Sequence, residues 1–264
     1  MDVTTYGQCL WEAAPARPEL PRDEVHVWRA PLDAREADAT AWRELLAPEE
    51  RARADRFHFP KDRLHFTVAR GLLRRLVGLY TGLAPALLRF TYNDYGKPSL
   101  DMGAADDLRF NVSHSKGLAL YAFARGREVG VDVEFLKAEF GGEGIAARFF
   151  SPAEVAALRA LPEADQTRAF FDCWTRKEAY IKAQGQGLSL PLDGFDVSLA
   201  PGEGCALLAT RHDPAQAARW SLRALAPAPS YAAALAVEGH GWRLRCWRWE
   251  SLETTAGTTP EHEA

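Results

Sequence analysis

The stretch GVDVE, residues 130–134, decides how this chain folds, because it predicts a strand whose two faces differ. Side chains alternate across a strand, so Val131 and Val133 would share one face. Asp132 and Glu134 would share the opposite face. One interpretation is an ordinary half-exposed strand with acids on its solvated side. The other is a divalent cation site, since a hard cation such as Mg²⁺ allows two like charges to lie close together.

The stretch WTRKEAYIKAQGQG, residues 174–187, predicts a helix that ends at glycines. Trp174, Glu178 and Lys182 are spaced at i, i+4 and therefore form one stripe. A solvated Glu–Lys pair would explain two of them, but an indole favours burial and hence the edge of a site. Glu178 would then join the two strand carboxylates on the cation. Lys182 would meet phosphate oxygens as a point charge, and Lys177 would do the same or be solvated.

Composition and charge limit the class of protein. The 264 residues are 47% hydrophobic, enough for a sizeable core in one large domain or two small ones. The net charge of −4 does not favour nucleic acid, so a phosphate site must be a local cluster. No run of about 18 apolar residues occurs and no signal-peptide n-region opens the chain, so we expect a cytoplasmic protein without a membrane span. The cysteines are far apart and form no CxxC motif, which favours reduced thiols over a disulfide framework. They are Cys9, Cys173, Cys205 and Cys246.

The pattern of helices and strands predicts an α+β fold. We expect a loosely ordered N-terminus at residues 1–22, an N-terminal subdomain at 23–127, a C-terminal subdomain with the cation site at 128–250, and a disordered tail at 251–264. The elements expected in the first half are a strand at 25–30, a helix that begins at Pro48, an amphipathic helix at 66–80, and strands at 88–92 and 118–124.

The second half repeats this plan. Sliding the chain by 104 residues aligns Pro48 with Pro152 and Phe66 with Phe170, and each long helix then runs into glycine. Convergent helix signals would explain the alignment. Two similar α+β halves packed as a pseudo-dimer would explain it as well, and a site would then be expected between them.

The stretch FNVSHS, residues 110–115, is the third element that carries chemistry. A lone histidine is more often packed or solvated than functional. Here Ser113 and His114 stand where a strand leaves for a loop, and hydroxyls, imidazole and freed backbone amides make a reasonable phosphate pocket. YGKP, residues 95–98, is by itself a turn with an exposed lysine. No acid–His–nucleophile pattern accompanies His114, so a hydrolase triad is not indicated.

These motifs occur together in a fixed order. FNVSHS, GVDVE and WTRKEAYIKAQGQG follow YGKP, with FFSPAE before the long helix and GLSLPLDGF after it. The chain thereby resembles the 4′-phosphopantetheinyl transferases of the Sfp type, the larger monomeric class, from about Val25 to Trp249. The resemblance implies two similar α/β subdomains arranged as a pseudo-dimer, with coenzyme A and the active site at their interface. The implied reaction transfers the 4′-phosphopantetheine of coenzyme A to a serine of an apo acyl or peptidyl carrier protein, needs Mg²⁺ and releases 3′,5′-ADP.

The resemblance also implies roles for the acids and for one lysine. Asp132, Glu134 and Glu178 would hold Mg²⁺, which bridges the pyrophosphate. Lys182 would contact the pyrophosphate and stabilise the leaving group, where charge builds up. Glu154 of FFSPAE is the implied general base for the carrier serine. As an acid near a helix start, Glu154 also has a full structural explanation.

Coenzyme A itself would contact a second set of residues. By resemblance, Ser113 and His114 meet the 3′-phosphate, helped by Arg53 and by Lys97, which precedes Pro98 in YGKP. Glu50 departs from the family, which often has lysine at this position. A phosphate contact from residue 50 is therefore not expected, and Arg51 or Arg53 would compensate.

The carrier protein would dock on the segment Phe135–Phe149. Its GGEG run predicts a mobile loop that orders on docking, or simply a poorly packed linker. Phe135, Leu136 and Phe140 would supply apolar contact. Two other classes remain as alternatives. One is a catalytically inactive coenzyme A-binding module, which the presence of all three carboxylates and the lysine disfavours, and the other is a Mg²⁺-dependent phosphohydrolase.

Overall fold

The computed structural model describes residues 9–34, 36–101, 107–137 and 142–249, so the tail predicted at 251–264 lies outside the described residues. A five-stranded sheet forms the first half of the core. Its two outer neighbours, β1 and β12, run parallel to each other, β12 is also parallel to β2, and the other pairs are antiparallel. The strand order is β1 (Trp11–Ala13), β12 (Arg243–Arg248), β2 (Glu24–Pro31), β6 (Leu118–Arg125), β5 (Leu108–Ser115).

A three-stranded antiparallel sheet forms the second half of the core, and two small hairpins lie outside both sheets. The sheet has the order β10 (Trp220–Leu225), β11 (Tyr231–Glu238), β7 (Val129–Phe135). The hairpins are β3 (Phe90–Tyr92) with β4 (Pro98–Leu100), and β8 (Phe195–Val197) with β9 (Leu207–Thr210). The predicted strands at 25–30, 88–92, 118–124 and 130–134 are thus confirmed, the second beginning two residues late.

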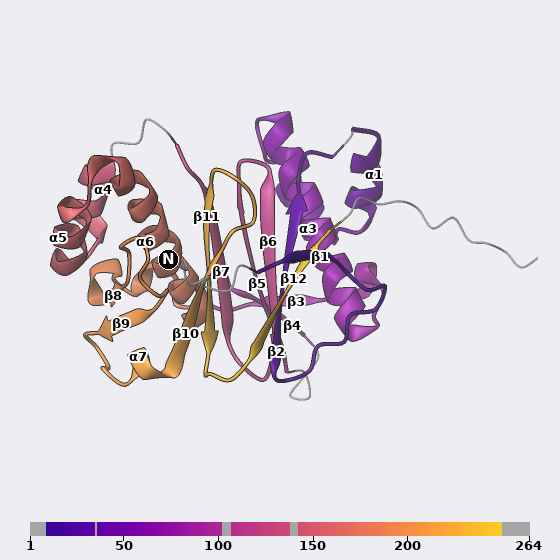
Figure 1. The fold of residues 1–264 in the computed structure, drawn as a ribbon. Helices are drawn as coiled ribbons and strands as arrows, with labels where there is room; N and C mark the ends of the chain where they lie inside the picture. The colour runs from indigo at the N-terminus through magenta and orange to yellow at the C-terminus, as the bar shows by residue number, and fades with distance from the viewer. Residues whose placement is uncertain (1–8, 35, 102–106, 138–141, 250–264) are drawn as a thin grey trace, which may run out of the picture.

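The helices fall into two groups along the chain. The first group is α1 (Glu36–Glu44), α2 (Pro48–Ala54) and α3 (Pro60–Thr81). The second is α4 (Gly142–Phe149), α5 (Pro152–Ala160), α6 (Glu163–Gln184) and the short α7 (Gln216–Arg219). Single 3-10 turns occur at Pro85–Leu87, Gly187–Ser189 and Leu192–Gly194. Figure 1 shows both sheets in the middle of the molecule, with α1 and α3 at one side and α4–α6 at the other.

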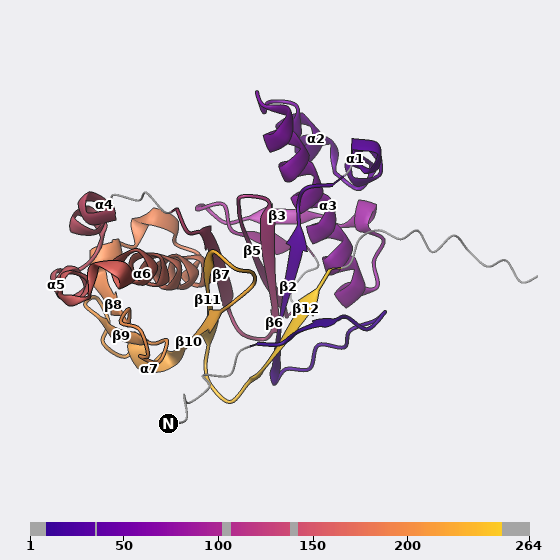
Figure 2. The same cartoon turned by 45° about the horizontal axis from the view of Figure 1, so that its top comes forward.

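Alternation along the strands produces four layers. Val27 of β2 and Val131 of β7 belong to the apolar core between the two sheets. Trp28, one residue on, packs in a second core with α3, and Ala234 of β11 packs in a third core with α6. The layers are therefore α3, first sheet, second sheet and α6, and Figure 2 shows α6 against β7 and β11. Asp132 must face α6 because its neighbour Val131 faces the other sheet.

The helix boundaries follow local signals in both halves. Proline stands at the first turn of α2 and of α5, where its missing N–H costs nothing. α3 and α6 each have 22 residues and end at a glycine in the left-handed region, Gly82 (φ 75°) and Gly185 (φ 69°). The predicted helices at Pro48, 66–80 and 174–184 are confirmed.

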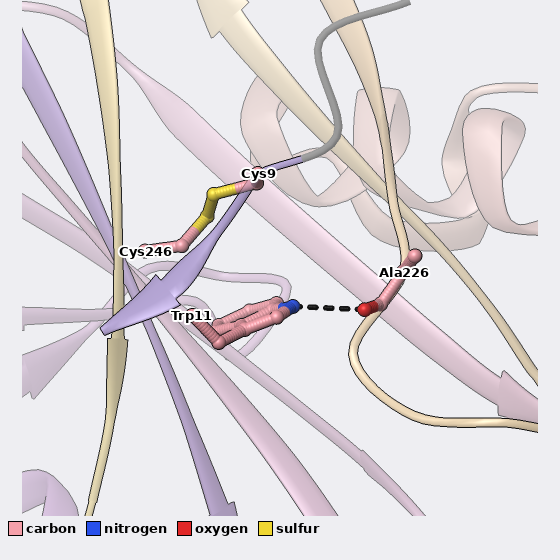
Figure 3. The surroundings of a disulfide bond; sticks show 4 residues. All are labelled: Cys9, Trp11, Ala226 and Cys246. Atoms are coloured by element: carbon pink, nitrogen blue, oxygen red, sulfur yellow. Dashed lines mark hydrogen bonds between the residues drawn. A yellow bond between two sulfur atoms is a disulfide. The ribbon is translucent and has the colours of Figure 1, made fainter. Parts of the chain in front are cut away.

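The N-terminal segment differs from its prediction. Trp11–Ala13 forms β1 within the stretch expected to be loosely ordered, and Cys9 forms a disulfide with Cys246 of β12 across a Cα–Cα distance of 6.0 Å. Figure 3 shows this bond beside Trp11, whose indole N–H donates to the Ala226 carbonyl at 2.8 Å. The prediction of reduced thiols was therefore wrong for two cysteines and holds for Cys173 and Cys205, which are free. Spacing along the chain could not reveal a pair whose partners meet only through β12.

The strand β12 follows the second sheet along the chain but belongs to the first sheet. β12 lies in residues 128–250, assigned to the C-terminal subdomain, yet pairs with β2 of the first sheet. Within the part of the chain that the structure describes, no helix is long and apolar enough to cross a membrane.

Candidate active site

The edge strands β5 and β7 lie side by side, and side chains of β5 join them. Alternate side chains on β5 accept hydrogen bonds from alternate backbone N–H groups of β7, each twenty positions further on. Polar residues at every second position of FNVSHS therefore complete a seam between the two sheets. The pairs are Asn111 Oδ1 with Val131 N (3.0 Å), Ser113 Oγ with Val133 N (3.4 Å), and Ser115 Oγ with Phe135 N (3.2 Å).

The same two hydroxyls hold the acids of β7. Ser113 Oγ donates to Asp132 Oδ1 at 2.8 Å, and Ser115 Oγ donates to Glu134 Oε2 at 2.9 Å. Asp132 is 3% exposed, whereas Glu134 is half-buried. The two acids thus share one face of β7, as the alternation in GVDVE predicted.

α6 brings the third acid and a lysine to this face. Lys182 Nζ lies 2.6 Å from Asp132 Oδ1 and 3.0 Å from Ser113 Oγ. Glu178 stands one turn earlier on the same stripe. The helix lies this close because Gly130 has no side chain: a Cβ there would be 2.2 Å from the Ala179 carbonyl oxygen.

The three acids influence one another electrostatically. Burial raises the pKa of Glu178, and the neighbouring charge of Asp132 raises it further. Burial and Asp132 also raise the pKa of Glu134, against a smaller opposite effect of the Ser115 hydrogen bond. Asp132, Glu134 and Glu178 therefore lie within electrostatic reach of one another, and their role as metal ligands stays a prediction.

The donor set fits a hard divalent cation. Asp132 Oδ2 is buried and has no hydrogen-bond partner among the described residues, although a buried carboxylate oxygen ordinarily has one. Carboxylate oxygens are the ligands that Mg²⁺ prefers. In the described ranges the three acids are not already gathered at coordinating distances as a cluster of metal-binding side chains. The Lys182 ammonium lies against one oxygen of Asp132, Oδ1, at 2.6 Å.

A cavity of about 580 Å³ is lined by Glu178 and Lys182 of α6 and by residues of the first half of the chain. It is large enough for an extended ligand rather than a single ion. Most of the residues predicted to contact coenzyme A line this cavity. Ser113 does not line it, and its hydroxyl instead faces Asp132 of β7. The lining residues among them are Arg53, Lys97, Pro98, His114, Glu178 and Lys182.

Several cations around the cavity are already paired. Lys97 Nζ lies 2.6 Å from Glu128 Oε2, and its ammonium also donates to the Ala183 carbonyl at 2.7 Å. Arg70 pairs with Glu50 and donates to the Tyr92 hydroxyl. Arg53 instead lies over the Phe66 ring at 5.2 Å and has no carboxylate partner among the described residues.

His114 contributes a neutral imidazole. Burial lowers the pKa of His114, and the nearby charges of Lys182 and His65 lower it further. An entering phosphate would favour the charged form and so strengthen binding.

Comparisons with known proteins identify the family of this chain. Residues 128–236 match the family described as the 4′-phosphopantetheinyl transferase superfamily, and residues 32–124 match 4′-phosphopantetheinyl transferase, N-terminal. A 4′-phosphopantetheinyl transferase from Nostoc, HetI, is 41% identical over 92% of this chain and 99% of its own length. The chain belongs to the 4′-phosphopantetheinyl transferase superfamily. The Bacillus subtilis 4′-phosphopantetheinyl transferase Sfp is 36% identical over 59% of this chain and 67% of its own length.

Glu154 is the family-implied residue that the structure does not bring to the site. Its Oε2 forms an ion pair with Lys177 at 2.7 Å and accepts from the Ser151 N–H, while Oε1 accepts from the Val197 N–H at 2.8 Å. Glu154 is 3% exposed and Lys177 is fully buried. Because both oxygens are engaged away from the cavity, the structure does not support Glu154 as the general base. Lys177 is neither a phosphate contact nor solvated, and both sequence interpretations of it were wrong.

Glu50, at the start of α2, is likewise a buried acid that is paired with cations. Its carboxylate accepts from the Ala47 N–H at 2.8 Å and pairs with Arg70 and with Arg74, the latter at 2.5 Å. The cost of burying the charge is thus offset by two guanidinium groups and a backbone donor, although the net gain of such a buried cluster is small. Arg51, one of the two proposed substitutes, donates to the Arg43 carbonyl of α1 and does not line the cavity.

The proposed docking segment is more regular than predicted. Residues 142–149 form α4 rather than a loop, and Phe149 packs edge-on against Trp174 at 6.0 Å. Phe135 packs edge-on against Tyr231 at 5.2 Å. Phe140, also expected to contact a partner, lies outside the described residues.

Sequence reasoning missed the seam residues Asn111 and Ser115. Their signal was present, because polar side chains at 111, 113 and 115 alternate with apolar ones at 110 and 112. Period-two polarity on an edge strand marks one face as a polar contact surface. Here that face meets β7 instead of solvent.

Proposed function

We propose that this protein transfers the 4′-phosphopantetheine group of coenzyme A to a serine of an apo acyl or peptidyl carrier protein. Membership of the transferase superfamily supports the reaction class. The observation that carries the proposal is the contact of Lys182 with Asp132, one helical turn from Glu178, at a cavity of about 580 Å³ that Arg53 and His114 also line. A pyrophosphate linked to a nucleotide matches that combination of cation site and anion site.

Coenzyme A would occupy the cavity between the two halves. Arg53, Lys97 and His114, which line the cavity together with Pro98, would meet its phosphates. Ser113, next to His114 in β5, would contribute to the same phosphate contact, although its hydroxyl also donates to Asp132. In this proposal the molecule is a monomeric pseudo-dimer, since the first sheet supplies β5 and the second supplies β7.

The carboxylates Asp132, Glu134 and Glu178 would hold Mg²⁺. When bound, the ion would neutralise charge on the pyrophosphate. Lys182 stands beside these acids as a fixed ammonium and offsets the charge that builds on the departing phosphate. Its present ion pair with Asp132 keeps it at that place before substrate enters.

The bond changes balance as a phosphoryl transfer. The serine oxygen of the carrier attacks the phosphorus that bears pantetheine, a new O–P bond forms, and the bond to 3′,5′-ADP breaks. The serine proton must pass to a base. In this proposal the cation occupies Glu134 and Glu178, and Lys177 occupies Glu154, so the serine proton passes to solvent water.

The carrier protein would approach over Phe135 and α4. Phe135 continues β7 directly beyond Glu134, so a partner seated there places its serine beside the acids. The proposed location of the reaction is the cytoplasm, although the cysteines no longer argue for it.

The test is mass spectrometry of several apo carrier proteins incubated with coenzyme A, Mg²⁺ and the protein. We expect a phosphopantetheine adduct on the carrier serine. Glu178→Gln should abolish the adduct, whereas Glu163→Gln, an exposed change in the first turn of the same helix, should leave it. Coenzyme A binding without an adduct on any carrier, or phosphate release without a carrier, would refute the proposal.

A further inference from the structure

The polar face of β5 does more than close the seam between the sheets. We propose that Ser115 is a positioning residue for Glu134, and that β5 sets the spacing of the carboxylates that receive the cation. This inference rests on the cation site of the proposed function. It concerns a residue to which neither the family resemblance nor the comparisons give a role.

The Ser115 hydroxyl has a fixed direction. Its oxygen accepts the Phe135 N–H at 3.2 Å, which uses one of its two lone pairs on the backbone of β7. A hydroxyl has one proton, and this proton is left to point at Glu134 Oε2, 2.9 Å away. The backbone contact therefore aims the side-chain contact, and among the described residues the printed hydrogen bond to Glu134 goes to Oε2.

Ser113 repeats the arrangement two residues earlier. Its oxygen accepts from the Val133 N–H and from Lys182 Nζ, and its proton goes to Asp132 Oδ1 at 2.8 Å. Both serines thus bind the residue twenty positions on through the backbone and the residue nineteen positions on through the side chain. Moving two residues along β5, from Ser113 to Ser115, therefore moves the contact two residues along β7, from Asp132 to Glu134.

This arrangement solves a specific problem at the site. Two carboxylates on one face of a strand repel each other, and without partners they would turn apart. Each serine holds one oxygen of one acid and leaves the second oxygen to face a cation. Asp132 Oδ2 is that second oxygen, buried and without a hydrogen-bond partner among the described residues.

Direct metal binding gives the readout. Mn²⁺ is titrated into the full-length protein with coenzyme A present, and free Mn²⁺ is followed by electron paramagnetic resonance. Loss of a residue that orients a metal ligand ordinarily weakens metal affinity by about 10- to 100-fold. We expect Ser115→Ala to weaken Mn²⁺ binding at least about tenfold and Ser115→Thr, which keeps the hydroxyl, to remain close to the parent. Ser221→Ala, on the far edge strand β10, is the matched control and should not change affinity.

A double-mutant cycle separates positioning from general loss of structure. If Ser115 acts through Glu134, then Ser115→Ala should cause no further loss of Mn²⁺ affinity in a Glu134→Gln background. Additive losses, or an unchanged affinity in folded Ser115→Ala, would overturn the inference. Should Ser115→Ala not fold, Ser115→Cys replaces it in the same cycle, since a thiol is close in shape but a weak donor. Mn²⁺ binding is measured without a carrier protein, so a failed transfer reaction would refute the proposed function and leave this result standing.

Discussion

Gly130→Ala is expected to move α6 and with it half of the site. An alanine Cβ at this position would lie 2.2 Å from the Ala179 carbonyl oxygen and 2.3 Å from the Ala183 nitrogen. Both obstacles are helix backbone, which no side-chain rotation can relieve. Ordinary contacts begin near 3.4 Å, so the helix must withdraw from β7 by roughly the 1.2 Å between 2.2 and 3.4 Å. Overpacking of this kind costs about 3 kcal/mol, the upper end of its usual range.

The displacement should also be seen in function. α6 carries Glu178 and Lys182, and a misplacement of about 1 Å at a reacting centre can reduce the rate about 100-fold. We expect the urea midpoint of Gly130→Ala to fall by about 1 M, together with a transfer rate about 100-fold lower.

Gly144→Ala is the matched control for stability, because a Cβ there meets no atom within 4 Å. As a helical position in α4 it should be neutral or stabilised by up to about 1 kcal/mol. Gly130→Ala protein that unfolds at the parent's urea concentration would show that α6 is not held against β7 by this glycine.

Three further perturbations test other parts of the structure. Lys177→Met leaves the buried Glu154 charge unpaired and should cost about 3–5 kcal/mol in urea unfolding, most of which the double change with Glu154→Gln should restore. Burial lowers the pKa of His26 below 6.5, so the unfolded chain binds more protons in acid; the parent's urea midpoint should fall as pH drops below about 6.5, and that of His26→Gln should fall less. Dithiothreitol should lower the melting temperature of the parent and not of Cys9→Ser, because the bond to Cys246 closes a sequence separation of 237 and its loss removes up to about 5 kcal/mol.

The parts of the molecule that sequence predicted well are those with a local cause. GVDVE lies within β7 and the stripe Trp174–Lys182 lies within α6, since periods of two and of about 3.6 are properties of neighbouring residues. Prolines and glycines fixed the helix ends for the same reason. Lys182 then reaches Asp132, because α6 packs on the face of β7 that Gly130 leaves open.

The parts that sequence could not predict depend on partners far along the chain. In the sequence Lys177 resembles any helical lysine. In the fold it is buried, forms an ion pair with Glu154 and donates to the carbonyls of Leu192 and Phe195. Glu154 in turn looks like a free acid near a helix start. The seam partner of Ser115 is likewise unknown until β5 and β7 are adjacent. In each case the local pattern is satisfied by solvent as easily as by a buried partner, and only the fold decides between them.

The offset of 104 residues relates the two halves position by position, and the first half lacks the acids of the proposed cation site. It pairs Glu50 with Glu154, and both sit at the third position of a helix start, buried and matched by cations of the following long helix. It pairs the site residues, however, with different chemistry: Asp132 with Trp28, and Glu178 with Arg74. Trp28 donates to the Tyr80 hydroxyl inside an apolar core, and Arg74 serves Glu50. At these positions the first half therefore has no carboxylates for a cation.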